Sequence, residues 1–516
     1  MLDMLHSSAE PKQIQKLNLL IGTDYKFSYL YCLFSQKSVL GEDMENSLYS
    51  QLAEKMTGLI RSGALTAGER LPSVRQLSKR EKVSISTVIA AYSLLEEQGW
   101  VSVRPKSGYY VRRQVRESLE TPSPAAVESR PVIATTSQLV MDVQRDACRP
   151  HAVSFSRATP AADFPIVRHV QRTYTRVSRI RNHLGLGDTN PEGPYELRQQ
   201  IAHHAVDAGV AVAPDSIVTT AGCLNAMGLC LQVLTRPEDV VAVESPCYYG
   251  ILQLIEAYGL KAIEIPAHPD TGLSLEALRL AMEQWPLKAV VTVSSYSNPL
   301  GCSIPDNRKK ELVALLEQYQ VPLIEDDIYG DLYFGERRTH AVKAFDSQGL
   351  VLLCSSLSKT IDPQLRVGWI LAGRYYEQLL HRKFVNMLST PVLPQLVCAE
   401  VLGQGIYERH LRQAREAYRQ RYLRLVDLVA EHFPPETKIS RPQGGIVTWL
   451  ELPRGIDTTE LYYDCRNRNI LIAPGEMFSL NKQFRNCLRL NYAPRWTAER
   501  EDAIRYMGQW VKDRIV

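Results

Sequence analysis

The sequence predicts a multidomain chain in which a small basic α+β head precedes a large α/β body with a mixed, mostly parallel sheet. Three observations support this prediction. Residues 44–113 carry 11 Lys and Arg against 6 Glu and no Asp, about +5, whereas the whole 516-residue chain carries only +4. Residues 114–150 are polar and interrupted by proline, as linkers are. Beyond residue 150, apolar runs of strand length alternate with helical stretches up to the C-terminus.

The composition is that of an ordinary globular protein, with 45% hydrophobic and 22% charged residues. No apolar run reaches the roughly 18 residues that a membrane-spanning helix needs, and the N-terminus lacks a secretory signal pattern. The ten cysteines show no C-x-x-C or Cys/His metal spacing, which favours reduced thiols over disulfides or a metal centre. We therefore expect a cytoplasmic protein with no membrane segment and no bound metal.

Residues 1–43 have weak periodicity and precede the first clear helical pattern. They are either a short extra element or a stretch that an upstream translation start adds without function, and we favour the second. The predicted organisation is an N-terminal extension over 1–43, a head over 44–113, a linker over 114–150 and a body over 151–516.

The head follows the pattern of three helices and a hairpin. Leu48–Ile60 has helical apolar spacing, and Ser73 is a suitable N-cap for a second helix. Ser84 or Ser86 would cap a third helix, which Gly99 would end. Two short strands around a Pro-Lys-Ser-Gly turn are predicted at 101–104 and 108–111. These elements make a winged helix-turn-helix, whose third helix has a small, polar N-terminus that suits the major groove of DNA.

Four stretches of the head resemble the GntR-type winged helix: Leu71-Pro-Ser-Val-Arg, Val83-Ser-Ile-Ser-Thr-Val, Leu95-Glu-Glu-Gln-Gly-Trp and Ser107-Gly-Tyr-Tyr-Val. The resemblance covers about 65 residues and implies that the head binds double-stranded DNA. It implies DNA contacts at these positions: Arg75, Ser84, Ser86, Thr87, Lys106, Ser107 and Gly108. The sequence departs from the family at Ile85 and Ile89, where some relatives carry arginine, which implies fewer base contacts there.

Continuous apolar runs in the body predict strands that are buried on both faces of a sheet, at 217–220, 240–243, 289–294, 321–324 and 350–354. Helical stretches lie between them, so the sheet is expected to be mostly parallel and covered by helices. Parallel sheets place their chemistry at the carboxyl ends of strands, so the residues that follow these runs are candidates for a site.

Lys359 directly follows one of these runs among small polar residues, where a lysine could form a Schiff base. Arg366, together with Ser356 and Ser358, would make an anion pocket that suits a phosphate. Asp326 ends another run, as either a functional carboxylate or a helix-capping one.

Three further stretches follow strands: Thr220-Ala-Gly222-Cys223, Glu244-Ser-Pro-Cys-Tyr248 and Ser297-Asn298-Pro-Leu-Gly301. Backbone N–H groups after Gly222 could bind a phosphate at a helix start. The aromatic ring of Tyr248 could stack on a flat ring or pack in the core. Taken alone, each stretch is more typical of a turn or of core packing.

In this order and spacing, the stretches resemble class I aminotransferases, which are fold-type I enzymes that depend on pyridoxal 5'-phosphate. The resemblance covers about 365 residues, from near Ser154 to the C-terminus. It implies that Lys359 holds the cofactor as an internal aldimine and that Asp326 pairs with the pyridine nitrogen, which makes the ring an electron sink. The other implied cofactor contacts are Tyr329 and Asn298 at the ring oxygen, Tyr248 stacked on the ring, and Gly222, Cys223, Ser356, Ser358 and Arg366 around the phosphate.

Two positions near the two ends of the body bear on the reaction. Arg489 in Cys487-Leu-Arg-Leu-Asn resembles the arginine that grips the substrate carboxylate in this family. Asp188 aligns where these enzymes often place a tyrosine that reaches the cofactor of the neighbouring subunit. This departure leaves cofactor binding in place but argues against efficient transamination.

A GntR-type head, a linker and an aminotransferase-like body resemble the MocR subfamily of transcription regulators. The resemblance implies a homodimer that binds an operator with paired half-sites. It implies a regulator that senses an amino acid or amine through external aldimine formation at Lys359. The alternative is an active aminotransferase with an accessory DNA-binding head, which the retained Lys359, Asp326 and Arg489 permit. A third alternative is a metabolite sensor that forms no covalent adduct.

Overall fold

The computed structural model describes residues 48–61, 65, 68–98, 100–104, 108–111, 119–125, 130–133, 138–180 and 190–515. The chain divides into two compact units, with the boundary after Gln114. The extension predicted over 1–43 lies outside the described residues. Within the described ranges, no helix combines the length and apolarity that crossing a membrane requires.

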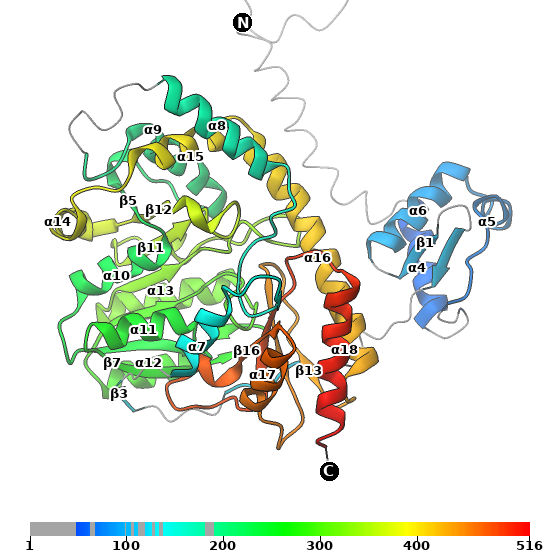
Figure 1. Cartoon of the computed structure of the whole chain (residues 1–516). Helices are drawn as coiled ribbons and strands as arrows, with labels where there is room; N and C mark the ends of the chain where they lie inside the picture. Colours follow the sequence, from blue (N-terminus) through cyan, green and yellow to red (C-terminus); the bar gives the residue numbers. More distant parts are fainter. Residues whose placement is uncertain are drawn as a thin grey trace, which may run out of the picture. The chain divides into compact units, whose positions relative to one another are not determined.

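The head unit consists of three helices and a two-stranded antiparallel hairpin, as the sequence predicts (Figure 1). Its elements are α4 (Leu48–Arg61), α5 (Val74–Glu81), α6 (Ile85–Glu97), β1 (Val101–Arg104) and β2 (Gly108–Val111). The apolar face of α6 packs on α4 and α5, and Tyr92 on this face donates a hydrogen bond to the carbonyl of Pro72, 2.7 Å away. This packing leaves the opposite face of α6 to solvent.

Serine side chains set the starts of the second and third helices. Ser73 caps α5 in a reciprocal pair with Gln76, because each side chain accepts a hydrogen bond from the other residue's backbone N–H. Ser84 rather than Ser86 caps α6, and its Oγ accepts from the N–H of Thr87 at 3.0 Å. Gly99, the predicted end of this helix, lies outside the described residues.

The body is built on a nine-stranded mixed sheet in the order β3-β7-β6-β9-β10-β11-β12-β5, with β8 paired to β7. Its strands are β3 (Val132–Ile133), β5 (Ile217–Thr220), β6 (Val240–Ser245), β7 (Lys261–His268), β8 (Gly272–Leu273), β9 (Leu287–Thr292), β10 (Leu323–Asp326), β11 (Val351–Ser356) and β12 (Gly368–Leu371). The consecutive strands β7, β6, β9, β10 and β11 run parallel, while β12 runs antiparallel to both of its neighbours, β11 and β5. The α/β class and the mostly parallel sheet are therefore confirmed.

Strand residues alternate between two apolar cores, one on each face of the sheet. Val240 and Ala242 of β6 belong to one core, and Val241 and Val243 belong to the other. Helices α12 and α13 cover the first face, and α10 and α11 lie among those that cover the second (Figure 1). The helices from α8 to α15 are α8 (Ile166–Ile180), α9 (Tyr195–Ala205), α10 (Cys223–Leu234), α11 (Tyr249–Ala257), α12 (Leu275–Gln284), α13 (Asp306–Tyr319), α14 (Tyr376–Met387) and α15 (Val392–Gly403).

A smaller C-terminal part completes the body. It contains the long helix α16, which lies against α18, and a four-stranded antiparallel sheet in the order β13-β14-β17-β16 (Figure 1). Its helices are α16 (Ile406–His432), α17 (Thr458–Asn467) and α18 (Ala498–Lys512). Its strands are β13 (Lys438–Ile439), β14 (Val447–Glu451), β16 (Ala473–Pro474) and β17 (Cys487–Asn491), and β15 (Ile470–Leu471) pairs separately with β4 (Val153–Ser154). The pairing of β4 with β15 ties the beginning of the body to this part.

The linker predicted over 114–150 needs correction, because the described parts of this segment pack on the body. Strand β3 joins the main sheet beside β7, and helix α7 (Gln138–Asp146) buries Leu139, Val140 and Val143 in the body core. The N–H of Ser123 donates to Glu451 Oε2 at 2.7 Å. Proline and polar residues predicted irregular backbone, whereas the described parts of the segment include a strand and a helix that pack on the body.

Candidate functional site

The candidate site is a cavity of about 190 Å³ at the carboxyl ends of the parallel strands. Asp326 ends β10 and Ser356 ends β11, while Tyr248 and Asn298 lie in the segments that follow β6 and β9. The residues that line the cavity are Cys223, Leu224, Met227, Tyr248, Val293, Asn298, Asp326, Ile328, Tyr329, Ser356, Ser358, Lys359, Pro363 and Arg366. Nine of these were singled out from the sequence, so the strand-end argument brought together residues that are far apart in the chain.

Lys359 lies in the turn after β11, and its Nζ donates a hydrogen bond to the carbonyl oxygen of Ala158, 2.5 Å away. Burial lowers the pKa of this lysine to about 8, and the positive charge of Arg489 lowers it in the same direction, although Asp326 opposes both. At neutral pH a useful fraction of the side chain is thus the free amine, which is the nucleophilic form.

Asp326 is buried on the same side of the sheet. Its Oδ1 accepts hydrogen bonds from the N–H of Ile328 at 3.1 Å and from the thiol of Cys223 at 3.2 Å. Burial raises the pKa of Asp326 to about 6, and the hydrogen bond from Cys223 partly opposes this. Because the thiol of Cys223 points to Asp326, a phosphate contact of this residue would come from its backbone N–H, at the start of α10.

One end of the cavity is suited to an anion. Gly222 is the N-cap of α10, with φ of +99°, and a Cβ at this position would lie 2.6 Å from Nη2 of Arg366. Glycine therefore allows the guanidinium to approach the helix N-terminus. Ser356 and Ser358 are buried beside it, and the N–H of Ser358 donates to Ser356 Oγ at 3.3 Å. Helix N–H groups, a guanidinium and hydroxyl groups together fit a phosphate.

Two tyrosines and an asparagine complete the set of predicted residues that line the cavity. Tyr329 is buried, and burial raises the pKa of its phenol. Burial also raises the pKa of Tyr248, so both phenols stay neutral and can donate hydrogen bonds at physiological pH. Asn298 is held from behind by Arg489, whose Nη1 donates to Asn298 Oδ1 at 3.2 Å.

Arg489 does not line the cavity itself but is fully buried on β17 behind Asn298. A second nitrogen of its guanidinium donates to the carbonyl of Ser156, while its Nε has no hydrogen-bond partner among the described residues. The segment that contains Ser156 and Ala158 thus contacts both Arg489 and Lys359. Asp188, which aligns where the resembling enzymes often place a tyrosine, lies outside the described residues.

Sequence reasoning missed the apolar wall of the cavity and a buried carboxyl group behind it. The wall consists of Leu224, Met227, Val293, Ile328 and Pro363. Glu244, near the end of β6, accepts from Thr292 Oγ1 at 2.9 Å, and burial raises its pKa to about 8. Its position near a strand end was a signal that could have found it.

A second polar cluster adjoins the site on the side of α9. Arg338 forms ion pairs with Asp327 and Asp331, and all three side chains are largely buried. His204 Nε2 lies 2.8 Å from Asp331 Oδ2. The hydroxyl of Tyr407 lies 2.9 Å from the same oxygen and 3.0 Å from Oγ1 of Thr360, the residue after Lys359. The cluster therefore connects to the neighbours of both Asp326 and Lys359.

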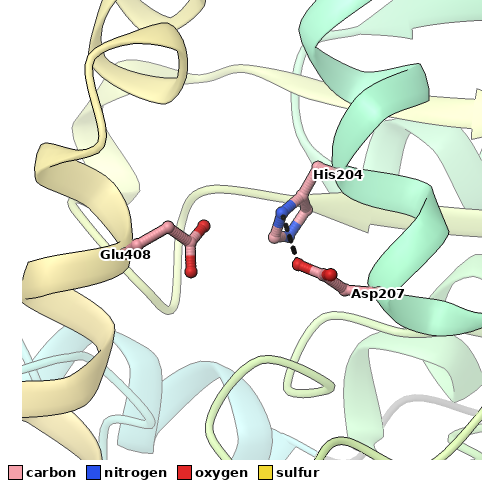
Figure 2. Close-up of side chains that lie close together, drawn as sticks. All are labelled: His204, Asp207 and Glu408. Atoms are coloured by element: carbon pink, nitrogen blue, oxygen red, sulfur yellow. Dashed lines mark ion pairs between the residues drawn. The ribbon is translucent and has the colours of Figure 1, made fainter. Parts of the chain in front are cut away.

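Figure 2 shows the outer side of this cluster, where His204 and Asp207 lie together and Glu408 of α16 faces them. Their ligand atoms lie within 4.8 Å of one another, a spacing that could hold a metal ion. Burial by itself would lower the pKa of His204, but the charge of Asp331 and its hydrogen bond to the ring together outweigh burial, so the pKa is raised. Both ring nitrogens of His204 face carboxylates, Nε2 that of Asp331 and Nδ1 that of Asp207, so we assign these groups to charge pairing.

Of the predicted DNA-contacting residues that the structure describes, Ser84, Ser86 and Thr87 lie at the start of α6, Arg75 lies on α5 and Gly108 begins β2. Arg75, Ser84 and Ser86 are exposed, and Thr87 is half-buried. Gly108 begins β2 with φ of +114°, and its neighbours Lys106 and Ser107 lie outside the described residues. Exposed hydroxyls at the start of α6 and the exposed Arg75 on α5 are suited to phosphates and base edges.

Comparisons with known proteins agree with this division of the chain. A family model described as "Bacterial regulatory proteins, gntR family" matches residues 48–111, and one described as "Aminotransferase class I and II" matches residues 180–506. The HTH-type transcriptional regulator YjiR of Escherichia coli (strain K12) is 38% identical over 463 residues, which is 90% of this chain and 98% of the relative. The chain belongs to the MocR subfamily of GntR-type regulators.

Another relative matches both parts of this MocR-type chain, and a solved structure shows the fold of the body. The regulator YdcR of the same organism is 37% identical over 467 residues, 90% of this chain and 99% of the relative. The crystal structure of LysN, an α-aminoadipate aminotransferase from Thermus thermophilus complexed with N-(5'-phosphopyridoxyl)-L-leucine, is 26% identical with a TM-score of 0.67. The match covers 74% of this chain and 96% of the LysN chain. The body of this MocR-type regulator therefore has the fold of pyridoxal-phosphate-dependent aminotransferases.

Proposed function

We propose that this MocR-type regulator binds pyridoxal phosphate covalently at Lys359 and senses an amino acid or amine through that site. The observation that carries the proposal is the convergence of Lys359, Asp326 and Arg366 on one cavity, in a chain that also has a GntR-type head. Ligand binding would then change how a homodimer engages an operator with paired half-sites.

The residues of the cavity fit this cofactor group by group. Arg366, the start of α10 and the two serines would hold the phosphate, and Asp326 would hold a proton at the pyridine nitrogen. Tyr329 and Asn298 would hydrogen-bond the ring oxygen, and Tyr248 would lie against the ring. When bound, the cofactor supplies an aldehyde carbon that forms a Schiff base with an amine.

The effector site would use Lys359 and Arg489. Arg489, which lies behind Asn298, would grip a carboxylate once it exchanges its hydrogen bonds to Asn298 and Ser156 for the effector, while the amine of the effector would take the place of the Lys359 amine. Lys359 donates a hydrogen bond to the carbonyl of Ala158, and Arg489 donates one to the carbonyl of Ser156. Occupancy of the site would therefore change the hydrogen bonds that hold this segment. A ligand shifts an equilibrium between two conformations only if it binds one of them better.

The deciding experiment is the visible absorption spectrum of the purified full chain while single amino acids are titrated in. A band that shifts with one ligand and then persists supports a sensor and identifies its class. A band that disappears as the amine form of the cofactor accumulates and returns with a keto acid supports the alternative, an active aminotransferase. A protein that never shows a band with added cofactor contradicts both.

We expect cofactor capture by the apoprotein to depend on the lowered pKa of Lys359. The rate of band appearance should rise with pH and level off above about pH 8, because only the free amine attacks the aldehyde. At pH 7 the free-amine fraction should exceed that of an ordinary lysine by about two orders of magnitude. Stopped-flow absorbance between pH 6 and 10 tests this. A midpoint near that of an ordinary lysine would contradict the proposed burial of the reactive amine.

Arg75→Ala is expected to weaken operator binding without changing the cofactor band, because Arg75 is exposed on α5 of the head, in a compact unit separate from the cavity. Loss of one phosphate contact should reduce the slope of log affinity against log salt by about 1. Fluorescence anisotropy across a salt series measures this. Arg382→Ala, an exposed arginine on α14 of the body, is the matched control. An affinity of R75A that equals that of the parent at every salt concentration would remove Arg75 from the interface.

A further inference from the structure

The exposed face of α6 is unusually apolar for a helix expected to read DNA. Ile85 is 50% exposed and Ile89 is 46% exposed. The spacing of four residues places both side chains on one face, one turn apart. The opposite face of α6 packs in the head core, where Val88 and Tyr92 are fully buried.

Hydrogen-bonding side chains are scarce on the same helix. From Ile85 to Leu95 it carries no Lys, Arg, Asn, Gln, Asp or Glu, so the bidentate contacts that usually identify guanine or adenine have no donor here. The hydroxyls at its start already interact with one another. Ser84 Oγ lies 2.7 Å from both Ser86 Oγ and Thr87 Oγ1, and it also accepts the N–H of Thr87. Apolar contact is therefore the main means of base discrimination that α6 offers.

Thymine is the base whose edge in the major groove carries an apolar group, the C5 methyl. Basic side chains flank the two isoleucines, since Arg75 and Lys79 on α5 and Lys82 in the turn before α6 are exposed and can meet phosphates. We propose that Ile85 and Ile89 read thymine methyl groups in each half-site, and that this contact sets the sequence preference of the head. The inference rests on the proposed DNA binding and deepens it by naming the recognised group.

The experiment uses the full chain and duplexes selected from a random library by repeated binding. Each thymine of the selected half-site is then replaced by deoxyuridine, which removes only the methyl group. We expect affinity to fall about threefold to tenfold at one or two positions, as burial of single methyl groups implies. I85A and I89A should bind the thymine duplex less tightly, and each should lose its sensitivity to deoxyuridine at its own position.

Ile133→Ala provides the matched control, because Ile133 is 70% exposed on β3 of the body. This variant should keep the affinity and the sensitivity to deoxyuridine of the parent. Selected duplexes that bind equally well with deoxyuridine at every position would overturn the inference and leave DNA binding intact. Retained sensitivity in both I85A and I89A would overturn it as well. Failure to select any duplex would overturn the proposed DNA binding and this inference with it. A change in oligomeric mass of I85A or I89A without loss of thymine discrimination would instead assign the face to protein contact.

Discussion

Lys359→Ala is expected to abolish the visible absorption band of the cofactor-loaded protein while leaving the body folded. No other lysine lines the cavity among the described residues, so no amine remains there to hold the aldehyde. The effect is complete loss of covalent retention, because a Schiff base either forms or does not. Gel filtration in the absence of free cofactor, followed by absorbance, measures it directly.

The fold should tolerate this change because Lys359 does not stabilise the apoprotein at neutral pH. Its pKa of about 8 in the folded chain lies below the value of about 10.5 for an exposed lysine. Burial of the ammonium thus costs stability below pH 8, and this cost fades as the pH rises from about 8 to about 10.5. Removal of the side chain at pH 7 eliminates that cost.

Lys383 offers a matched control within the same body. It is fully buried on α14, its Nζ donates to Thr219 Oγ1 at 3.3 Å, and burial lowers its pKa to about 8 as well. Lys383→Met should keep the band. Lys383 does not line the cavity, so its amine lacks the phosphate-binding groups and the Asp326 carboxylate that would hold the cofactor beside Lys359. A band that survives K359A and disappears in K383M would reassign the covalent site.

Much of the site could be predicted because strand ends in a parallel sheet converge. Apolar runs locate β6, β9, β10 and β11, and the polar residues after them therefore meet, although Tyr248 and Lys359 are far apart in sequence. The orientation of a side chain is a different matter. The strand-glycine-helix pattern at Gly222 predicts N–H groups for an anion, but nothing in it shows that the thiol of Cys223 points to Asp326.

Contacts between helices and loops left no pattern in the sequence. His204 and Asp331 meet although neither residue follows a predicted strand directly. Likewise, the proline-rich composition of 114–150 predicts irregular backbone, whereas the packing of α7 depends on a complementary apolar surface contributed by distant helices. Periodicity reports the faces of an element, and it does not identify the surface against which each face packs.

Arg338→Leu is expected to lower the free energy of unfolding of the body by about 3–5 kcal/mol at pH 7, because it leaves two buried carboxylates without their shared partner. Arg338 is only 6% exposed and pairs with both Asp327 and Asp331. His204 and Tyr407 still contact Asp331 in the variant, so Asp327 bears most of the loss. Asp327 adjoins Asp326, and Tyr407 contacts Thr360 beside Lys359. The variant should therefore also retain cofactor less well than the parent.

Urea unfolding of the full chain, followed by a signal of the body, tests this effect against Arg424→Leu. Arg424 makes a bidentate ion pair with Glu501 at the surface, where solvent screening limits the contribution to the free energy of unfolding to about 0–1 kcal/mol.

The effect of R338L should depend on pH. Burial acts to raise the pKa of Asp331, but His204 and Arg338 together outweigh burial and hold this pKa below its usual range. The pairing of Arg338 with Asp327, whose pKa burial raises to about 6, is lost first as the pH falls through about 6, whereas the stabilisation through Asp331 begins to be lost only below about pH 4, as the pH falls toward its lowered pKa. The difference between R338L and the parent should shrink in acid, whereas equal losses for R338L and R424L at pH 7 would show that the buried cluster does not hold the body together.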